Sequence, residues 1–261
     1  MGKVTVVITL YNKERYIDQA IGSVLRQTYS DWELLIIDDA STDGSVAKAR
    51  QFRDPRIRIV PLAENLGQCH VLNYALTMIT SPYFMQLDAD DWLDKDTLRI
   101  MVKAAEANPH AALFYGNHLT YWLDDQERVV RKEPIILEQY QDRYDLMLKM
   151  SNAMVPRFYR TEAVRDVGGW MAQVYGDRIA DDVQIALRLA GKYRLVWINE
   201  FLYHRRRDTD NWKKFEQSRP LRRQYRYELY NQILREWGGE YKADWVPQPD
   251  GSNYLRGFIR K

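Results

Sequence analysis

The sequence is poor in several features that stabilise or target proteins. A single cysteine among 261 residues excludes an internal disulfide, and only four histidines accompany it, which argues against a dedicated zinc site. No run approaches the roughly 18 apolar residues of a membrane-spanning helix. The apolar stretch at residues 4–10 is too short for a signal peptide and lacks a cleavage site. We therefore expect a cytoplasmic protein with at most peripheral membrane contact.

The chain also lacks an excess of one charge. Its 38 basic and 36 acidic side chains leave a net charge of +2, which gives no reason to expect nucleic acid as a partner. Hydrophobic residues make up 46% of the chain, so it has the composition of a globular protein. Basic residues gather locally at 204–226, where nine Lys and Arg face three Asp and Glu. This segment is either a solvated face or a phosphate-facing loop that continues into a docking surface.

The first 110 residues alternate between strand and helix patterns. Continuous apolar runs indicate buried parallel strands, and apolar residues at helical spacing separate them. Such alternation predicts a doubly wound α/β sheet, with ligands beyond the carboxyl ends of the strands. The expected strands are 4–9, 33–37, 57–60 and 83–87, and the expected helices are 17–25, 42–52, 67–79 and about 95–108.

The pattern after residue 110 is mixed. We expect strands at 113–115, 118–123, 155–159 and 194–198, and helices at 140–150 and 181–190. An amphipathic helix begins at Ser218 and ends at Gly238 and Gly239, with a loose tail beyond residue 247. We interpret the aromatic residues of this last helix as packing residues rather than as a sugar platform.

Three polar segments follow expected strands: residues 9–12, Asp38 with Asp39, and residues 88–91. Asp88 and Asp90 can approach one hard divalent cation, as carboxylates do where Mg²⁺ or Mn²⁺ also binds a diphosphate. Asp39 can accept a hydrogen bond from a pyrimidine N–H or a ribose hydroxyl. Each segment alone also fits a turn or a helix cap. Their shared place at strand ends favours a ligand site.

Several ordered motifs together resemble the family 2 glycosyltransferases over about residues 3–207. The motifs are residues 7–12, 23–29, 32–44, 65–67, 87–91, 168–170 and 180–189. Within that family, the N-terminal portion is similar to enzymes that build spore-coat or surface polysaccharides. The resemblance implies a GT-A fold, which is a mixed, mostly parallel sheet flanked by helices. It also implies a nucleotide-sugar donor and inversion at the anomeric carbon.

The resemblance further implies roles for individual residues. Thr9, Tyr11 and Asp39 would hold the nucleoside base, with Asn65 and Gly67 also at the nucleotide. Asp88 would lie near the ribose, Asp90 would bind Mn²⁺ or Mg²⁺ on the diphosphate, and Asp182 would be the general base. Arg207 stands where the family often has a histidine, and an arginine can clamp a diphosphate but cannot ligate a metal. We therefore assign no histidine ligand, and His204 lies three residues too early.

The resulting hypothesis is an inverting, metal-dependent glycosyltransferase. It would move a sugar from a UDP or dTDP donor to a hydroxyl of a glycan or lipid-linked saccharide. Residues 1–207 would form the catalytic domain, divided at 110 into a nucleotide-binding and an acceptor-side half. Residues 208–261 would form a basic, aromatic-rich helical extension, and a homo-oligomer stays open.

Two other classes stay open as well. A nucleotidyltransferase also uses paired aspartates on a metal, but it should carry a glycine-rich basic loop after its first strand. Residues 9–12 contain no glycine. A non-catalytic binding protein that retains the fold would use the basic segment as an interaction surface. The carboxylates at 88, 90 and 182 argue against that loss of activity.

Overall fold

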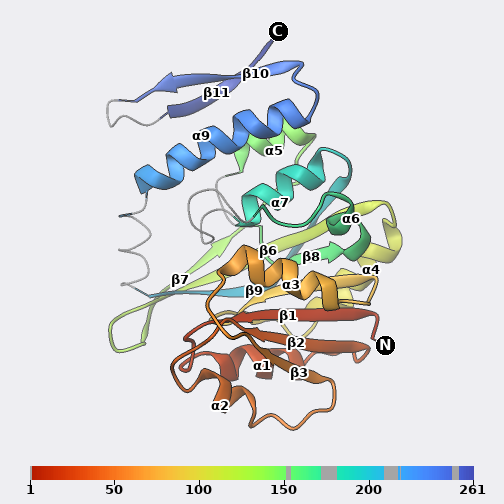
Figure 1. Cartoon of the computed structure of the whole chain (residues 1–261), viewed down its shortest axis with the longest axis vertical. Helices are drawn as coiled ribbons and strands as arrows, with labels where there is room; N and C mark the ends of the chain where they lie inside the picture. The colour runs from red at the N-terminus through yellow and green to blue at the C-terminus, as the bar shows by residue number, and fades with distance from the viewer. Residues whose placement is uncertain (1, 151–153, 172–180, 209–216, 218, 249–252) are drawn as a thin grey trace.

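A computed structural model describes residues 2–150, 154–171, 181–208, 217, 219–248 and 253–261. One large mixed sheet dominates it, with the strand order β3-β2-β1-β4-β8-β6-β9-β5 and with β7 paired to β6. In Figure 1 the strands β1 to β3 lie at one end of the molecule and α9 lies toward the other end, with α7 between them. The arrangement confirms the predicted α/β sheet flanked by helices.

The N-terminal half is the parallel part of the sheet. Its strands are β1 (Val4–Leu10), β2 (Trp32–Asp38), β3 (Ile57–Pro61) and β4 (Tyr83–Asp88). The intervening helices are α1 (Ile17–Leu25), α2 (Ser45–Ala49), α3 (Gln68–Met78) and α4 (Thr97–Ala107). Helices α1, α2 and α4 pack on one sheet face with Val6 and Ile8, whereas α3 packs on the other with Val7. Two separate cores cover the sheet, so its central strands read as continuous apolar runs.

The second half adds strands of both directions. They are β5 (Trp92–Leu93), β6 (Ala111–Leu123), β7 (Val129–Ile135), β8 (Arg157–Arg160) and β9 (Arg194–Asp208). Strand β9 runs parallel to β6, whereas β8 joins β4 to β6 in the antiparallel sense. The helices are α5 (Arg143–Lys149), α6 (Thr161–Asp166) and α7 (Asp181–Ala190).

Three sequence expectations were wrong in this half. Residues 113–115 and 118–123 belong to one strand, β6, whose pairing with β9 shifts register between Tyr115 and Asn117. Strand β9 continues ten residues past the expected end at 198, so Arg205, Arg206 and Arg207 lie in the sheet rather than in a loop. The tail expected to be loose beyond residue 247 contains β11 (Asn253–Arg260), which pairs with β10 (Tyr241–Pro247) as a hairpin.

The last helix, α9 (Arg219–Glu236), packs on the body of the protein. Its apolar residues Tyr225, Leu229 and Ile233 are buried in the same core as α3 and α7. Gly238 and Gly239, at φ 101° and 65°, end it as the sequence predicts. The predicted start at Ser218 lies outside the described residues.

Candidate functional site

The carboxyl ends of β1, β2 and β4 meet at one edge of the sheet. Thr9 is in register with Asp88, Leu10 is in register with Asp38, and the Asp39 N–H donates to the Leu10 carbonyl at 2.8 Å. The three polar segments predicted from the sequence therefore lie side by side. They converge because β1 pairs in parallel with β2 on one side and with β4 on the other.

Asp39 organises the loop between β3 and α3. Its carboxylate is only 5% exposed and accepts the backbone N–H groups of Leu66 and Gly67 at 2.7 and 3.0 Å. The Asn65 amide donates to the Asp39 carbonyl at 3.1 Å. Gly67, at φ 87° and ψ 161°, has a conformation that is essentially restricted to glycine. Three of the residues predicted at the nucleotide thus form one hydrogen-bonded unit.

Thr9 and Tyr11 flank this unit from β1. The Thr9 hydroxyl donates to the Gln68 side-chain oxygen at 2.9 Å, which connects the end of β1 to the first residue of α3. Tyr11 is half-buried directly after the strand. Asn12 takes a left-handed conformation at φ 50°, and its side-chain oxygen accepts the Thr42 N–H at 2.8 Å. The loop after β1 is therefore fixed against the loop after β2.

The acidic segment after β4 is held by cations. An Asp88 oxygen lies 2.6 Å from the Arg157 guanidinium, and an Asp90 oxygen lies 2.5 Å from the Lys13 ammonium. Burial alone would raise the pKa of Asp90, but the charge and hydrogen bond of Lys13 outweigh it and leave the pKa below its ordinary value. Asp90 is therefore an ionised carboxylate that keeps 24% of its side chain exposed.

Asp91 is the buried member of the same segment. Burial, together with the negative charges of Asp90 and Asp88, raises its pKa to about 8. It accepts the backbone N–H of Arg206 at 2.7 Å, which ties the segment to β9. Burial also lowers the pKa of Arg207 to about 10, and the neighbouring Arg205 adds to this effect. The carboxylates of the same cluster act on Arg207 in the opposite direction, so the residue predicted to clamp a diphosphate lies within their field.

A divalent cation fits this donor set. Asp88 and Asp90 offer hard oxygen atoms two residues apart at a strand end, which are the ligands that Mg²⁺ and Mn²⁺ take. Within the described part of the chain, no three His, Cys, Asp or Glu side chains form a ready-made cage. Such a site suits an ion that completes its shell with diphosphate oxygens and water.

Asp182 lies in the first turn of α7. Its carboxylate is half-buried and accepts the Val183 N–H at 2.9 Å. Two residues on, the buried Gln184 amide donates to the Cys69 sulfur at 3.5 Å. Cys69 follows Gln68, which contacts Thr9. The first turn of α7 thus packs on the first turn of α3, next to the end of β1. The neighbouring Asp181 side chain lies outside the described residues.

The motif at residues 168–170 supports α7. The Asn73 side chain of α3 accepts the Trp170 N–H at 2.9 Å and donates to the Trp170 carbonyl at 2.7 Å. The Arg188 guanidinium of α7 donates to the carbonyls of Val167 and Gly169. These bonds hold α7 and α3 together through the backbone of residues 167–170. None of them involves the carboxylates described above.

His204 packs against two aromatic side chains. Its ring stacks on Trp92 at 5.2 Å, and its Nδ1 lies 3.2 Å from the Tyr121 hydroxyl. Burial lowers its pKa. His118 is almost fully buried, and burial with the charges of Arg205 and Arg207 lowers its pKa to about 3.

Sequence reasoning missed three residues that complete the site: Lys13, Arg157 and Gln184. Arg157 is only 4% exposed and lies in a run of buried residues, 154–159, at the start of β8. A charged residue in such a run requires a partner, which was the signal available for it. Nothing in the local pattern distinguishes Lys13 or Gln184 from ordinary loop and helix residues.

Comparison with known proteins identifies the class. The model of the glycosyl transferase family 2 matches residues 5–168, which is more than half of the chain. The chain therefore belongs to glycosyl transferase family 2.

Within the described residues, no helix has the length and apolarity to cross a bilayer.

Three particular proteins are similar to it. The putative glycosyltransferase EpsE of Bacillus subtilis is 29% identical over 236 residues, which cover 89% of this chain and 80% of EpsE. The UDP-Glc:alpha-D-GlcNAc-diphosphoundecaprenol beta-1,3-glucosyltransferase WfgD of Escherichia coli is 33% identical over 115 residues, which cover 44% of this chain and 45% of WfgD. Two other curated relatives are matched over only 13% and 41% of their own length.

The third is a solved structure, the mannosyltransferase PcManGT from Pyrobaculum calidifontis in complex with GDP-Man and Mn²⁺. It superposes with a TM-score of 0.65 at 21% identity, covering 93% of this chain and 66% of that one. This likeness confirms the predicted GT-A fold.

Proposed function

We propose that the chain is an inverting, metal-dependent glycosyltransferase of surface polysaccharide synthesis. It transfers a sugar from a nucleoside diphosphate to an acceptor hydroxyl on a glycan or lipid-linked saccharide. One observation carries the proposal: Asp39, Asp88 and Asp90 lie at one sheet edge, and the helix that carries Asp182 packs beside that edge. WfgD, whose name gives a UDP-glucose donor and a diphosphoundecaprenol-linked acceptor, supports the substrate classes.

The donor base binds between Thr9, Tyr11 and Asp39. Each Asp39 oxygen already accepts one backbone N–H, and each retains a second lone pair for a base N–H. Because this carboxylate offers only acceptors, it suits a base with a ring N–H, such as the N3–H of uracil or thymine. The Gly67 N–H bonds the Asp39 carboxylate and the Asn65 amide bonds the Asp39 backbone carbonyl, so their role is to orient Asp39 toward the base. A UDP or dTDP sugar is therefore the expected donor.

The diphosphate binds at the acidic segment after β4. Asp90 would hold the cation, Asp88 would face the ribose, and Arg207 would face the phosphates. A bound Mg²⁺ or Mn²⁺ supplies charge stabilisation for the departing diphosphate. Lys13 bonds Asp90 in the structure and can add a second positive charge at the same oxygens. No protein nucleophile is needed for a single inverting displacement.

Asp182 takes the proton of the acceptor hydroxyl as that oxygen attacks the anomeric carbon. A half-buried carboxylate at the start of a helix meets the requirement for a base that is fixed yet reachable by the acceptor. A positioned base contributes about 10²–10⁴-fold to such a step. We expect the Asp182→Asn variant to lose that factor.

The test measures release of nucleoside diphosphate from a panel of UDP, dTDP and GDP sugars, with water as the acceptor. Asp182→Asn should slow release by about 10²–10⁴-fold, while binding of the nucleoside diphosphate with Mn²⁺ stays at the wild-type level. Asp31→Asn, an exposed carboxylate between α1 and β2, is the matched control and should leave both unchanged. Wild-type turnover in Asp182→Asn would remove this residue as the base.

A further inference from the structure

Two cations hold the acidic segment after β4, and they differ in their access to solvent. Asp88 pairs with Arg157 of β8, whose side chain is 5% exposed. Asp90 pairs at 2.5 Å with the Lys13 ammonium, and 28% of the Lys13 side chain is exposed. A lysine that reaches solvent can turn on its flexible four-carbon stem, whereas a buried arginine has no room to turn. The partner of Asp90 can therefore be exchanged, and the partner of Asp88 cannot.

The backbone of Lys13 is fixed, so a change of partner involves its side chain alone. The Lys13 N–H donates to the hydroxyl of the buried Ser45 at 2.8 Å. The Lys13 carbonyl accepts the N–H groups of Tyr16 and Ile17 at 2.9 and 3.0 Å, at the start of α1. The ammonium thus stays close to the acidic segment whichever partner it bonds.

The ammonium and a divalent cation compete for Asp90. Lys13 bonds one oxygen of this carboxylate, so Mg²⁺ or Mn²⁺ would have to displace it there. On the other oxygen the metal ion would lie about 5 Å from the ammonium, where the repulsion weakens its binding by about tenfold even in water. The charge of Asp88 is already opposed by Arg157. Asp88 and Asp90 together therefore attract a cation only weakly while Lys13 is in place.

A nucleoside diphosphate changes this balance. Its phosphate oxygens are anionic acceptors, which form strong charge-assisted hydrogen bonds with an ammonium. In the proposed function they bind at the same acidic segment, within reach of Lys13. When the ammonium bonds the phosphates, the Asp90 carboxylate is released, and the diphosphate adds its own negative charge to attract the cation.

We propose that Lys13 is an exchangeable counter-ion of Asp90, which keeps the divalent cation weakly bound until a nucleoside diphosphate takes the ammonium. The inference rests on the proposed glycosyltransferase function and adds to it the way in which the cation and the donor bind together. Without the nucleotide, the affinity for the cation is reduced by the fraction of molecules in which Asp90 is released. Coupling between two ligands is reciprocal, so the nucleotide strengthens cation binding by the same factor as the cation strengthens nucleotide binding.

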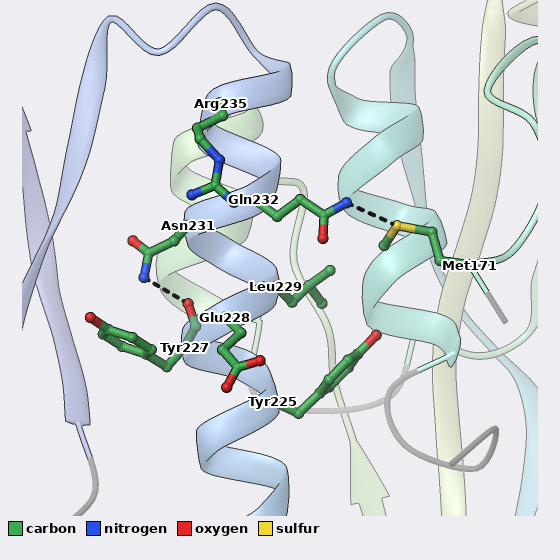
Figure 2. A pocket seen from close by; sticks show the side chains of 8 residues that line it. All are labelled: Met171, Tyr225, Tyr227, Glu228, Leu229, Asn231, Gln232 and Arg235. Atoms are coloured by element: carbon green, nitrogen blue, oxygen red, sulfur yellow. Dashed lines mark hydrogen bonds between the residues drawn. The ribbon is translucent and has the colours of Figure 1, made fainter. Parts of the chain in front are cut away.

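The experiment titrates Mn²⁺ into the full chain, with and without the best binder among UDP, dTDP and GDP, and follows the EPR signal of the unbound ion. Lys13→Met removes the ammonium, and Lys13→Arg keeps a cation at the same place. Lys48→Met is the matched control, because Lys48 is 33% exposed and pairs with Asp18 at 3.5 Å, outside the site. Figure 2 shows Arg235 at a pocket on α9, and Arg235→Met is a second control for the loss of a positive charge. Melting temperatures establish that all the proteins fold alike.

Without the nucleotide, Lys13→Met should bind Mn²⁺ about 5- to 30-fold more tightly than the wild type does. Lys13→Arg should bind it no more tightly than the wild type, and both controls should bind it like the wild type. The factor by which the nucleotide strengthens Mn²⁺ binding should fall in Lys13→Met, because Asp90 no longer has to be released.

Two results would overturn the inference and leave the proposed function in place. One is Mn²⁺ binding by Lys13→Met that is no tighter than that of the wild type, and the other is equal tightening in Lys13→Arg or in a control. If no protein binds Mn²⁺ even with the nucleotide present, the metal dependence of the proposed function fails, and the inference fails with it.

Discussion

The carboxylate of Asp39 has two roles in this account, and one substitution separates them. It accepts two backbone N–H groups from the loop before α3 and leaves lone pairs for a base. In Asp39→Asn one oxygen is replaced by an NH₂ group, which is a donor placed against the N–H of Leu66 or Gly67. A charge-assisted bond is lost and a buried donor is left unpaired.

Hydrogen bonds to a charged group contribute about 1.5–3 kcal/mol each, so we expect Asp39→Asn to lower the free energy of unfolding by about 2–3 kcal/mol. For a chain of this size, that corresponds to a fall in melting temperature of about 4–12 °C. Urea and thermal unfolding followed by circular dichroism measure both, with Asp31→Asn as control. A variant as stable as the wild type would show that the carboxylate does not hold the loop.

Three further predictions concern stability. His118 has a pKa of about 3 in the folded protein, whereas a histidine in the unfolded chain protonates near pH 6.5. As the pH falls from 6.5 to 5, the free energy of unfolding of the wild type should therefore fall by about 2 kcal/mol more than that of His118→Gln. Parallel pH profiles of the two proteins in urea unfolding would contradict this. Gly67→Ala should cost about 1–3 kcal/mol because its backbone conformation strains an L side chain, and an unchanged unfolding midpoint would refute that strain. Asp88→Asn should lower the free energy of unfolding by about 2–4 kcal/mol, because it removes the negative charge beside Arg157, which is 4% exposed and cannot reach water. Arg157→Met should cost less, because the Asp88 side chain that it leaves behind is 31% exposed. The reverse order in thermal melts would disprove the reasoning.

The sequence predicted the N-terminal half of the fold well. Its parallel strands are covered on both faces, so each is a plain apolar run, and the polar residues that end the runs meet at one edge of the sheet. The strands around Asp39 and Asp88 therefore followed from local patterns and from the parallel rule alone. Thr9 is in register with Asp88 because β1 and β4 begin at paired residues, Val4 and Tyr83.

The second half was harder to predict, because polar side chains in its strands are paired with residues that lie far away in the sequence. Strand β9 continues through Arg205, Arg206 and Arg207, which look like a basic loop in the sequence. In the structure, the Arg206 N–H bonds Asp91 and its guanidinium lies over the rings of Tyr16 and Trp92, and neither contact could be predicted from the sequence. The chain beyond residue 247 was predicted as a loose tail, because β11 is stabilised by pairing with β10 and by contacts with α9 and α5, which leave no local signature in the sequence. The roles assigned to Arg207 and Asp182 came from motif resemblance, since no local pattern distinguishes a base from a cap.

Binding of a nucleoside and its diphosphate, with and without Mn²⁺, tests the central claim most directly. The ligand is the best of UDP, dTDP and GDP, titrated by calorimetry into the wild type, Asp39→Asn and Asp90→Asn. We expect Asp90→Asn to lose the gain that Mn²⁺ gives the diphosphate but to keep its affinity for the nucleoside, whereas Asp39→Asn should weaken both. Full Mn²⁺-dependent affinity in Asp90→Asn would contradict the shared site at the edge of the sheet.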